Sequence, residues 1–322
     1  MRKSILVTGA MGQIGSELTV ALRHRYGGEC VLATDVRSDP PKTLRDSGPF
    51  DCLDCLDQER VGEVVRKHRV DTIFHLPALL SANAEKQPQR AWSVNMNTLL
   101  HVLEVAREQG SALFVPSSIA AFGPTTPLDD TPQDTIQRPT TMYGVTKVAG
   151  ELLCDYYHAR FGVDVRGVRY PGIISNLTLP GGGTTDYAVD IFYQAIQKKR
   201  YTCYLKPGTF LDMMYMPDAI QAAMDIMEAD GAKLRHRNAF NVSSMSFAPE
   251  QLAAAIQKHI PEFVMDHQVD PGRQAIAESW PNRMDDSAAR REWGWSPVYD
   301  MDRMVEEMLR TLGERFARGG FQ

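Results

Sequence analysis

The sequence predicts an α/β fold in which a doubly wound parallel sheet is followed by a smaller C-terminal lobe. Strand and helix patterns alternate from the first residues, which is typical of a parallel sheet covered by helices on both faces. After about residue 175 this alternation loosens. We therefore expect one domain over 1–175 and a second over 176–322, with some later segments returning to the first domain.

Composition narrows the classes of function. The 322 residues correspond to about two domains, with 43% apolar and 23% charged side chains, which is ordinary for a globular protein. Forty acidic against 35 basic residues give a net charge of −5, which argues against a nucleic acid partner. Because no apolar run approaches the roughly 18 to 20 residues of a membrane span, no membrane association is expected.

The cysteines and the N-terminus predict the compartment. Five cysteines are few and odd in number, which favours a reducing, soluble intracellular setting. Cys52 and Cys55 form a C-x-x-C pattern, but no second pair of ligands follows, so no metal site is predicted. The first expected strand begins directly after Met1–Lys3, so no secretory leader is expected.

The predicted strands of the first domain are short apolar runs, as in buried parallel strands. The first strand covers residues 4–8 and ends at a glycine. Further strands are predicted at 30–35, 71–75, 112–115 and 163–170. Right-handed crossovers are expected between them.

The helices alternate with these strands. Residues 14–26 place Ile14, Leu18, Ala21 and Leu22 at the spacing of one helix face. Further helices are predicted at 61–68, 91–109 and 143–161, and Gly110 and Gly162 end the last two. In the second domain we expect a helix at 185–198, strands at 202–205 and 213–216, and helices beginning near Pro217, Pro249 and Asp300.

A glycine-rich turn lies between the first predicted strand and helix. Gly9, Gly12 and Gly15 form G-x-x-G-x-x-G: the first permits the turn, the second admits a pyrophosphate, and the third lets helix and strand pack. The helix N-terminus offers N–H groups and partial positive charge to phosphates. Asp35, about 20 residues further on, is placed to accept hydrogen bonds from the adenosine ribose. The pattern predicts NAD rather than NADP, a preference that nearby Arg37 tempers.

A tyrosine and a lysine share one face of a predicted helix. Tyr143 and Lys147 lie four residues apart, one turn of helix. Tyrosine has a pKa near 10, and an ammonium within about 4 to 6 Å favours the phenolate and lowers that pKa. Ser117 and Ser118 follow a strand at its carboxyl end, where ligands bind in open parallel sheets. We predict Tyr143 as general base, Lys147 as its partner, and Ser118, with Ser117 as second candidate, as the group that orients a substrate hydroxyl.

Taken together, these residues make the chain resemble the extended short-chain dehydrogenase/reductase family over nearly its whole length. The matching pieces are the glycine turn, Asp35, Asp54, 71–75, Asn95, Ser117–Ser118, Tyr143 with Lys147, 169–172, 283–285 and 293–297. The resemblance implies a Rossmann-type domain that binds NAD and a smaller C-terminal substrate lobe.

The resemblance also implies the cofactor contacts. Asp54 and Cys55 would border the adenine, Leu76 to Ala78 would face the nicotinamide ribose, and Ile173 would lie near the carboxamide. The implied cofactor residues are Gly9, Met11, Gly12, Gln13, Ile14, Gly15, Asp35, Val36, Arg37, Asp54, Cys55, Leu76, Pro77, Ala78, Asn95, Tyr143, Lys147, Tyr170 and Ile173.

Departures from the family pattern select a branch. Nucleotide-sugar epimerases carry an arginine that holds the diphosphate where this chain has Leu211, and an apolar side chain cannot neutralise a diphosphate. Dehydratases place Thr-Asp-Glu after the strand, where this chain has Ser117–Ala121 without acid or base groups. The remaining segments resemble the short-chain L-threonine 3-dehydrogenase branch, at 79–81, 117–123, 171–175 and most closely at 180–188.

This branch implies oxidation of the L-threonine 3-hydroxyl to 2-amino-3-ketobutyrate by NAD, with functional coupling to a 2-amino-3-ketobutyrate CoA ligase. A zwitterionic substrate needs partners for both charges, because burying an unpaired charge is costly. The candidate substrate residues are Ser81, Ser118, Tyr143, Thr184, Thr185 and Trp280, with backbone N–H groups after Gly181–Gly183. The glycines would let this loop close over the substrate.

Two alternatives remain open. A nucleotide-sugar 4-epimerase or related enzyme of the same fold would bind uridine diphosphate tightly. A non-catalytic NAD-sensing module would typically lack Tyr143 or Lys147, and both are present. The resemblance further implies a homodimer in which 91–109 and 143–161 pack against their copies as a four-helix bundle. It implies the mitochondrial matrix in a eukaryote and the cytoplasm in a bacterium.

Overall fold

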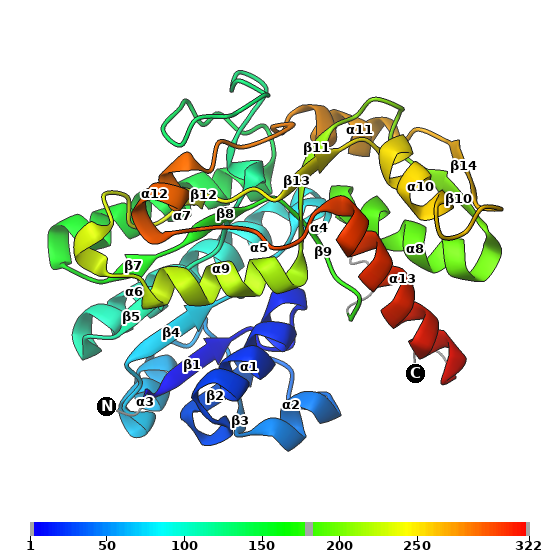
Figure 1. Cartoon of the computed structure of the whole chain (residues 1–322). Coiled ribbons are helices and arrows are strands. Elements are labelled where there is room, and N and C mark those ends of the chain that lie inside the picture. The colour runs from blue at the N-terminus through cyan, green and yellow to red at the C-terminus, as the bar shows by residue number, and fades with distance from the viewer. Residues whose placement is uncertain (1–2, 178–182, 320–322) are drawn as a thin grey trace.

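The computed structural model describes residues 3–177 and 183–319 (Figure 1). Its base is a parallel six-stranded sheet in the order β3-β2-β1-β4-β5-β7. The strands are β1 (Ile5–Thr8), β2 (Val31–Asp35), β3 (Phe50–Cys52), β4 (Thr72–His75), β5 (Ala112–Phe114) and β7 (Val165–Arg166). The strand order reverses between β1 and β4, which opens a crevice at their carboxyl ends. The predicted α/β class is confirmed.

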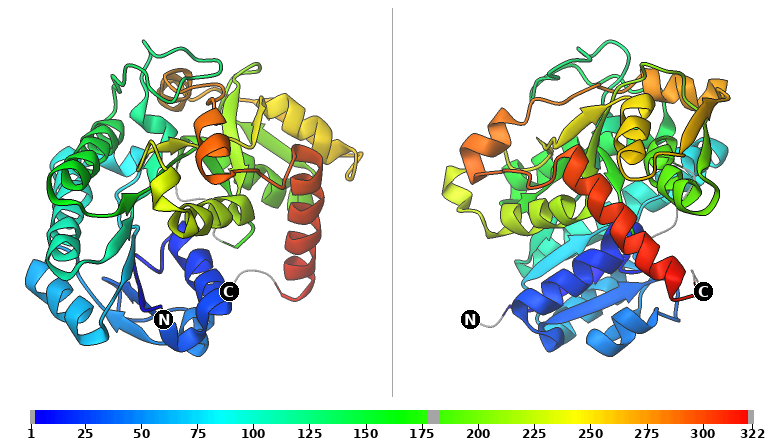
Figure 2. Two further views of the ribbon diagram at one scale, coloured as in Figure 1. Left: turned by 60° about the vertical axis from the view of Figure 1, so that its left-hand side comes forward. Right: turned by 45° about the vertical axis from the view of Figure 1, so that its right-hand side comes forward.

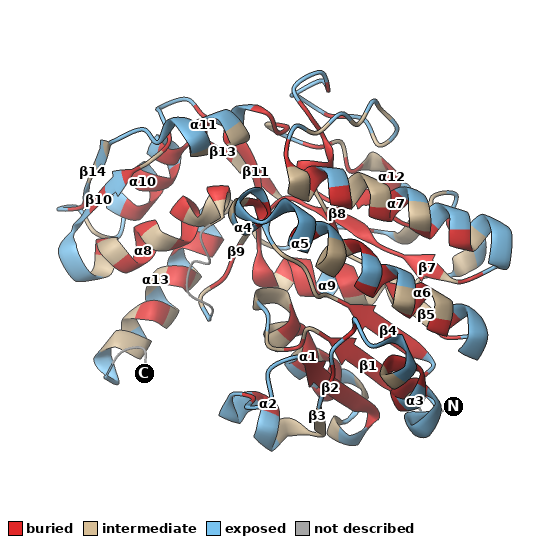
Figure 3. Ribbon diagram, turned by 180° about the vertical axis from the view of Figure 1, so that it is seen from behind, coloured by how far each residue is buried: buried red, intermediate tan, exposed pale blue. Residues whose placement is uncertain are grey.

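Helices cover both faces of this sheet, and their exposed sides face outward (Figure 3). Ile5 and Val7 pack with one group of helices, whereas Leu6 packs with the other, because successive strand residues point to opposite faces. The first group is α1 (Gln13–Tyr26) and α9 (Met216–Glu228), and the second is α3 (Gln58–His68), α6 (Thr98–Gln109) and α7 (Met142–Phe161). Among the described residues, none of the helices is long and apolar enough to cross a bilayer.

The helix predicted over 91–109 is present, but it is not α-helical throughout. It runs as α5 (Pro88–Trp92), a π-helical turn (Ser93–Asn97) and α6, with helical backbone angles at both junctions. Within the turn, the Asn95 side chain accepts from the Leu79 N–H at 2.8 Å and donates to the Thr146 hydroxyl at 3.0 Å. Single π turns occur frequently at functional sites. Here the turn joins Asn95 to the segment after β4 and to α7.

The single strand predicted over 163–170 is also divided. Gly167 separates β7 from β8 (Val168–Tyr170), and a Cβ atom there would lie 2.1 Å from the Val115 carbonyl oxygen. After this close contact, β8 pairs in a separate sheet with β6 (Ser117–Ser118) and β12 (Phe240–Asn241). The division therefore aligns the two serines with the end of β8.

The C-terminal lobe has its own hydrophobic core, which includes Phe192, Phe247 and Met308. Its strands form the sheet β13-β11-β9 and the pair β10-β14, and Figure 2 shows the C-terminal helix α13 on the outside of the lobe. The bounds are β9 (Gly172–Ile174), β10 (Arg200–Cys203), β11 (Leu211–Tyr215), β13 (Met245–Phe247), β14 (Val264–His267), α8 (Tyr187–Lys198), α10 (Pro249–Gln257), α11 (Pro271–Glu278) and α13 (Met301–Ala317).

Several short elements have no counterpart in the sequence prediction: α2 (Lys42–Ser47), α4 (Ser81–Lys86), α11, α12 (Ser287–Trp293), and the strands β3, β6, β9, β12, β13 and β14. Helices α9 and α12 contribute Ala219 and Ala288 to the same core cluster as β1 and α1. The domain boundary near residue 175 stays a prediction.

A buried carboxyl group in the C-terminal lobe makes stability depend on pH. Burial raises the pKa of Asp212 to about 8, although the Met284 N–H (2.8 Å) and the Ser243 hydroxyl (2.9 Å) donate to it. Between about pH 4 and pH 8 the folded state thus holds a proton that the unfolded state has lost, so stability falls as pH rises. Asp212→Asn removes this proton, and the slope of the unfolding free energy with pH should become less negative by up to about 1.4 kcal/mol per pH unit.

Urea unfolding from pH 5 to pH 8 measures this slope. The matched control is Asp266→Asn in β14, where the carboxylate is 61% exposed, and it should leave the slope unchanged. Equal slopes in wild type and Asp212→Asn would show that Asp212 is already ionised in the folded protein across this range.

Candidate active site

The glycine turn follows β1 and opens α1. Gly9 has a φ angle of +70°, and a Cβ atom there would lie 2.9 Å from the Pro77 nitrogen. A Cβ atom at Gly15 would lie 2.2 Å from the Gly9 carbonyl oxygen. Both positions therefore require glycine, one for its conformation and one for contact between the helix and the turn. The arrangement fits the pyrophosphate of a dinucleotide at the N-terminus of α1.

Asp35 lies at the end of β2, beside this turn. Its carboxylate accepts from the Met11 N–H at 2.9 Å, the Arg37 N–H at 3.1 Å and the Arg37 guanidinium at 3.0 Å. Burial raises the pKa of Asp35, but the hydrogen bonds from Arg37 and Met11 outweigh burial and hold it below its ordinary value. Asp35 is therefore ionised at neutral pH and placed as an acceptor.

A cavity of about 1170 Å³, open to solvent, lies along the turn and Asp35. Predicted cofactor residues that line it are Gly9, Gly12, Asp35, Val36, Arg37, Asp54, Cys55, Leu76, Pro77 and Ala78. Sequence reasoning missed the lining residues Leu53, Leu56, Leu79, Arg90, Ser93, Val94 and Thr98. Most of the missed residues flank predicted ones or lie at the π-helical turn and its ends.

A second cavity, of about 830 Å³, adjoins the first, because Leu76 and Ala78 line both. It brings together predicted residues of all three classes from distant parts of the chain. Its lining includes the predicted residues Gln13, Ile14, Ser81, Ser117, Ser118, Tyr143, Lys147, Tyr170, Ile173, Thr184, Thr185 and Trp280. Asp186 also lines this cavity and was not predicted. The predicted loop residues Gly181 and Gly182 lie outside the described residues.

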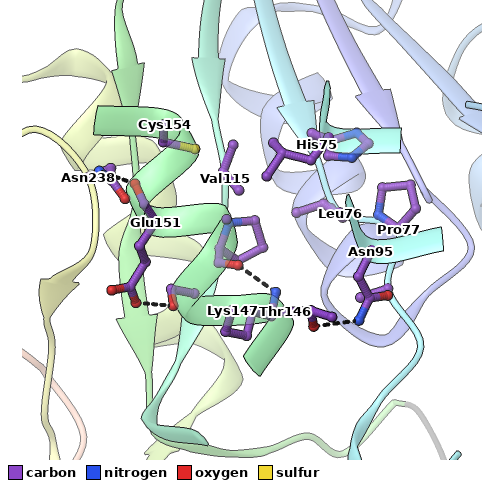
Figure 4. A pocket seen from close by; sticks show the side chains of 15 residues that line it. His75, Leu76, Pro77, Asn95, Val115, Thr146, Lys147, Glu151, Cys154 and Asn238 are labelled. Carbon is purple, nitrogen blue, oxygen red and sulfur yellow. Dashed lines mark hydrogen bonds between the residues drawn. The ribbon is translucent and has the colours of Figure 1, made fainter. Parts of the chain in front are cut away.

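The N-terminal half of α7 positions the predicted acid–base pair. The Thr141 hydroxyl caps this helix by accepting from the Gly144 N–H at 3.1 Å. The Lys147 ammonium lies 5.4 Å from the centroid of the Tyr143 ring. It donates to the Pro116 carbonyl at 2.7 Å (Figure 4). A phenol, an ammonium and the Ser118 hydroxyl thus line one cavity. Such a set suits proton transfer to or from an alcohol oxygen.

Comparison with known proteins identifies the family of the chain. The model of the NAD dependent epimerase/dehydratase family matches residues 5–243. The chain belongs to this family. An uncharacterized epimerase/dehydratase of Staphylococcus haemolyticus is 54% identical over 311 residues, which cover 97% of this chain and 98% of the relative.

Two solved structures are similar over almost their full length. An L-threonine dehydrogenase of Clostridium difficile has a TM-score of 0.95 and 56% identity, covering 97% of this chain and 98% of that one. A GalE-like L-threonine dehydrogenase of Cupriavidus necator in its holo form has a TM-score of 0.93 and 51% identity, with 96% and 99% covered. The chain is thus an NAD-dependent oxidoreductase of the extended short-chain dehydrogenase/reductase fold.

Membership in this epimerase/dehydratase family confirms NAD as the cofactor. The staphylococcal relative is bacterial, so it gives no support to a mitochondrial location. The homodimer stays a prediction.

Within the described residues no cluster of three or more His, Cys, Asp or Glu side chains is placed to hold a metal ion. Of the C-x-x-C pair, Cys52 is exposed and Cys55 lines the first cavity.

Three predicted cofactor residues line neither of the two cavities. Met11 bonds to Asp35 through its N–H group, and Gly15 packs α1 against the turn. Asn95 lines a small chamber behind Lys147, shown in Figure 4, and bonds to Leu79 and Thr146. In the structure these residues therefore shape the backbone around the cavities.

A neutral histidine, which sequence reasoning missed, supports the end of β4. Burial lowers the pKa of His75 to about 3. Its Nδ1 lies 2.9 Å from the Thr8 hydroxyl and its Nε2 lies 3.1 Å from the Thr98 hydroxyl. Because Thr98 donates its own proton to the Val94 carbonyl at 2.6 Å, we assign the ring proton to Nε2. The uncharged ring ties β1, β4 and α6 together beneath the site.

Proposed function

We propose that the protein oxidises the 3-hydroxyl of L-threonine to 2-amino-3-ketobutyrate with NAD. The observation that carries this proposal is the second cavity, in which Tyr143, Lys147 and Ser118 face the segment Thr184–Asp186 and Trp280. The two solved relatives named as L-threonine dehydrogenases share this fold at more than half identity. The substrate of this chain is inferred from both.

Each residue of the set has a distinct task in the proposed reaction. Tyr143 accepts the proton of the substrate hydroxyl as general base. Lys147, fixed by the Pro116 carbonyl, stabilises the phenolate of Tyr143 by its positive charge. Ser118 donates to or accepts from the substrate oxygen and so orients it. Bound NAD supplies the acceptor for the hydride that leaves the same carbon.

The side of the cavity that is lined by Ser81, the segment Thr184–Asp186 and Trp280 would bind the ammonium, the carboxylate and the methyl group of the substrate. Asp186 is the one carboxylate among the described residues that line it, and we assign it to the substrate ammonium. Its carboxylate accepts from the Gly183 N–H at 2.7 Å, which fixes its direction. The hydroxyls of Ser81, Thr184 and Thr185 are assigned to the substrate carboxylate. Trp280, which is 6% exposed, would pack on the methyl group.

Asp186→Asn tests the assigned ammonium site. We expect the KM for L-threonine to rise by about tenfold to a hundredfold, because the amide cannot neutralise the ammonium, with a smaller change in kcat. NAD affinity should stay unchanged. The matched control is Asp190→Asn on α8, where the carboxylate accepts from Gln194 and does not line the cavity. A KM equal to that of wild type would remove Asp186 from the substrate site.

The structure disfavours both alternatives to this proposal. Leu211, at the position where epimerases carry the diphosphate-binding arginine, is fully buried in the core of the C-terminal lobe. Among its described residues, the lining of the substrate cavity contains no arginine. A sensing module has no need of a general base, yet Tyr143 and Lys147 are aligned on one cavity.

The test of the proposed function mixes purified protein with NAD and L-threonine and follows NADH absorbance. Growth of NADH with L-threonine supports the proposal, and the 2-amino-3-ketobutyrate formed would then pass to a coupled CoA ligase or lose carbon dioxide. If NAD binds but no NADH forms, the proposed substrate is wrong. Uridine diphosphate sugars and other 3-hydroxy amino acids, assayed in parallel, then separate an epimerase from a dehydrogenase of another substrate.

A further inference from the structure

A third polar residue lies on the face of α7 that carries the acid–base pair. Tyr143, Lys147 and Glu151 are each separated by one turn of the helix. In Figure 4, Lys147 and Glu151 both extend toward the segment that ends in β6. Lys147 donates to the Pro116 carbonyl at 2.7 Å, and the Ser117 hydroxyl donates to Glu151. The same short segment is thus held at two consecutive residues.

Glu151 also holds the strand on the other side of β6. Its two oxygens accept from the Arg169 guanidinium at 3.0 and 2.8 Å and from the Gln137 amide at 2.7 Å. Ser117 pairs with Arg169 in the register of β6 and β8, and Glu151, Ser117 and Arg169 are all less than 8% exposed. A buried ion pair adds little net stability, whereas it can fix one arrangement of the groups around it.

The residue after this double anchor is Ser118, which lines the substrate cavity with Tyr143. A shift of Ser117 along the strand moves Ser118 with it, because the two are adjacent. We propose that Glu151 is a positioning residue of the active site: through Ser117 and Arg169 it fixes β6 on α7 and sets the place of the Ser118 hydroxyl relative to Tyr143. This inference rests on the roles proposed above for Tyr143 and Ser118.

Ser117→Ala is the most selective test, because it removes only the hydroxyl that binds Glu151. Amide hydrogen exchange of residues 117–122 should become faster in this variant. With L-threonine, kcat should fall by about tenfold to a hundredfold, while the KM and the affinity for NAD stay within about twofold. Ser117→Thr, which keeps the hydroxyl and has cavities on both sides for its methyl group, should restore kcat and slow exchange.

Glu151→Gln should also make amide hydrogen exchange of residues 117–122 faster. If this variant fails to fold, the Ser117 variants decide the test. Asp155→Asn is the matched control, since Asp155 lies one turn further along α7 and accepts from Asn238 rather than from β6. It should leave exchange in 117–122 and kcat unchanged. The proposal is overturned if exchange in Ser117→Ala equals that of wild type, or if kcat does not fall. If wild type binds NAD but does not oxidise L-threonine, the proposed substrate fails, and the exchange result alone decides whether Glu151 fixes β6.

Discussion

Tyr143→Phe should reduce L-threonine-dependent NADH formation by about a hundredfold to ten-thousandfold, the range expected when a general base is removed. The substitution deletes one oxygen atom and leaves α7 and its Thr141 cap unchanged. Lys147 keeps its bond to the Pro116 carbonyl, so the surroundings of the nicotinamide should persist. The loss should therefore appear in kcat, with NAD affinity within about threefold of wild type. Steady-state kinetics and titration with NAD measure the two quantities.

Tyr156→Phe is the matched control, because Tyr156 lies on the same helix with a ring that is 55% exposed to solvent. It should turn over L-threonine at the wild-type rate. If Tyr143→Phe kept more than about a tenth of the activity, another group would be the base. A parallel loss of NAD binding would instead show that the substitution disturbs the cofactor cavity, and Ser118→Ala would then be the better probe of the chemical step.

The cofactor turn was predictable because its geometry is local. Gly9 is required by its φ angle of +70°, and Gly15 is required by its close contact with the Gly9 carbonyl, so both reasons lie within the turn. Asp35 follows from the length of one helix and one strand. The pair Tyr143 and Lys147 needs only one helical turn. In each case, short-range backbone geometry places the side chains, so the spacing in the sequence carries the information.

Other features depend on contacts between distant segments. The break at Gly167 arises because the backbone meets the Val115 carbonyl, which no local pattern shows. The π-helical turn around Asn95 interrupts a run whose periodicity is helical throughout, and its bond to Thr146 joins residues 51 positions apart. Strands of two or three residues, such as β6, show too little pattern to be predicted. Asp186 was missed because its position depends on how the C-terminal lobe packs against α1 and α7, which are distant from it in the sequence.

The second large effect that we expect is a change of cofactor preference from NAD toward NADP. Asp35→Ala should weaken NAD binding by about tenfold to a hundredfold, because the ribose hydroxyls lose a charged acceptor. The same substitution removes the partner of the Arg37 guanidinium, which lines the cavity together with Arg90. Two arginines without the opposing carboxylate suit the 2′-phosphate of NADP, which Arg binds through paired hydrogen bonds. NADP affinity should therefore rise as NAD affinity falls.

Isothermal titration with NAD and with NADP measures the two affinities. Asp39→Ala is the matched control: Asp39 pairs with Arg45, is 90% exposed and does not line the cavity, so both affinities should stay as in wild type. Adding Arg37→Ala to Asp35→Ala separates the two contributions, since it should cancel the gain for NADP without restoring NAD. Unchanged NAD affinity in Asp35→Ala would mean that Asp35 serves only to hold Arg37 and the Met11 N–H, and that the adenosine ribose lies elsewhere in the cavity.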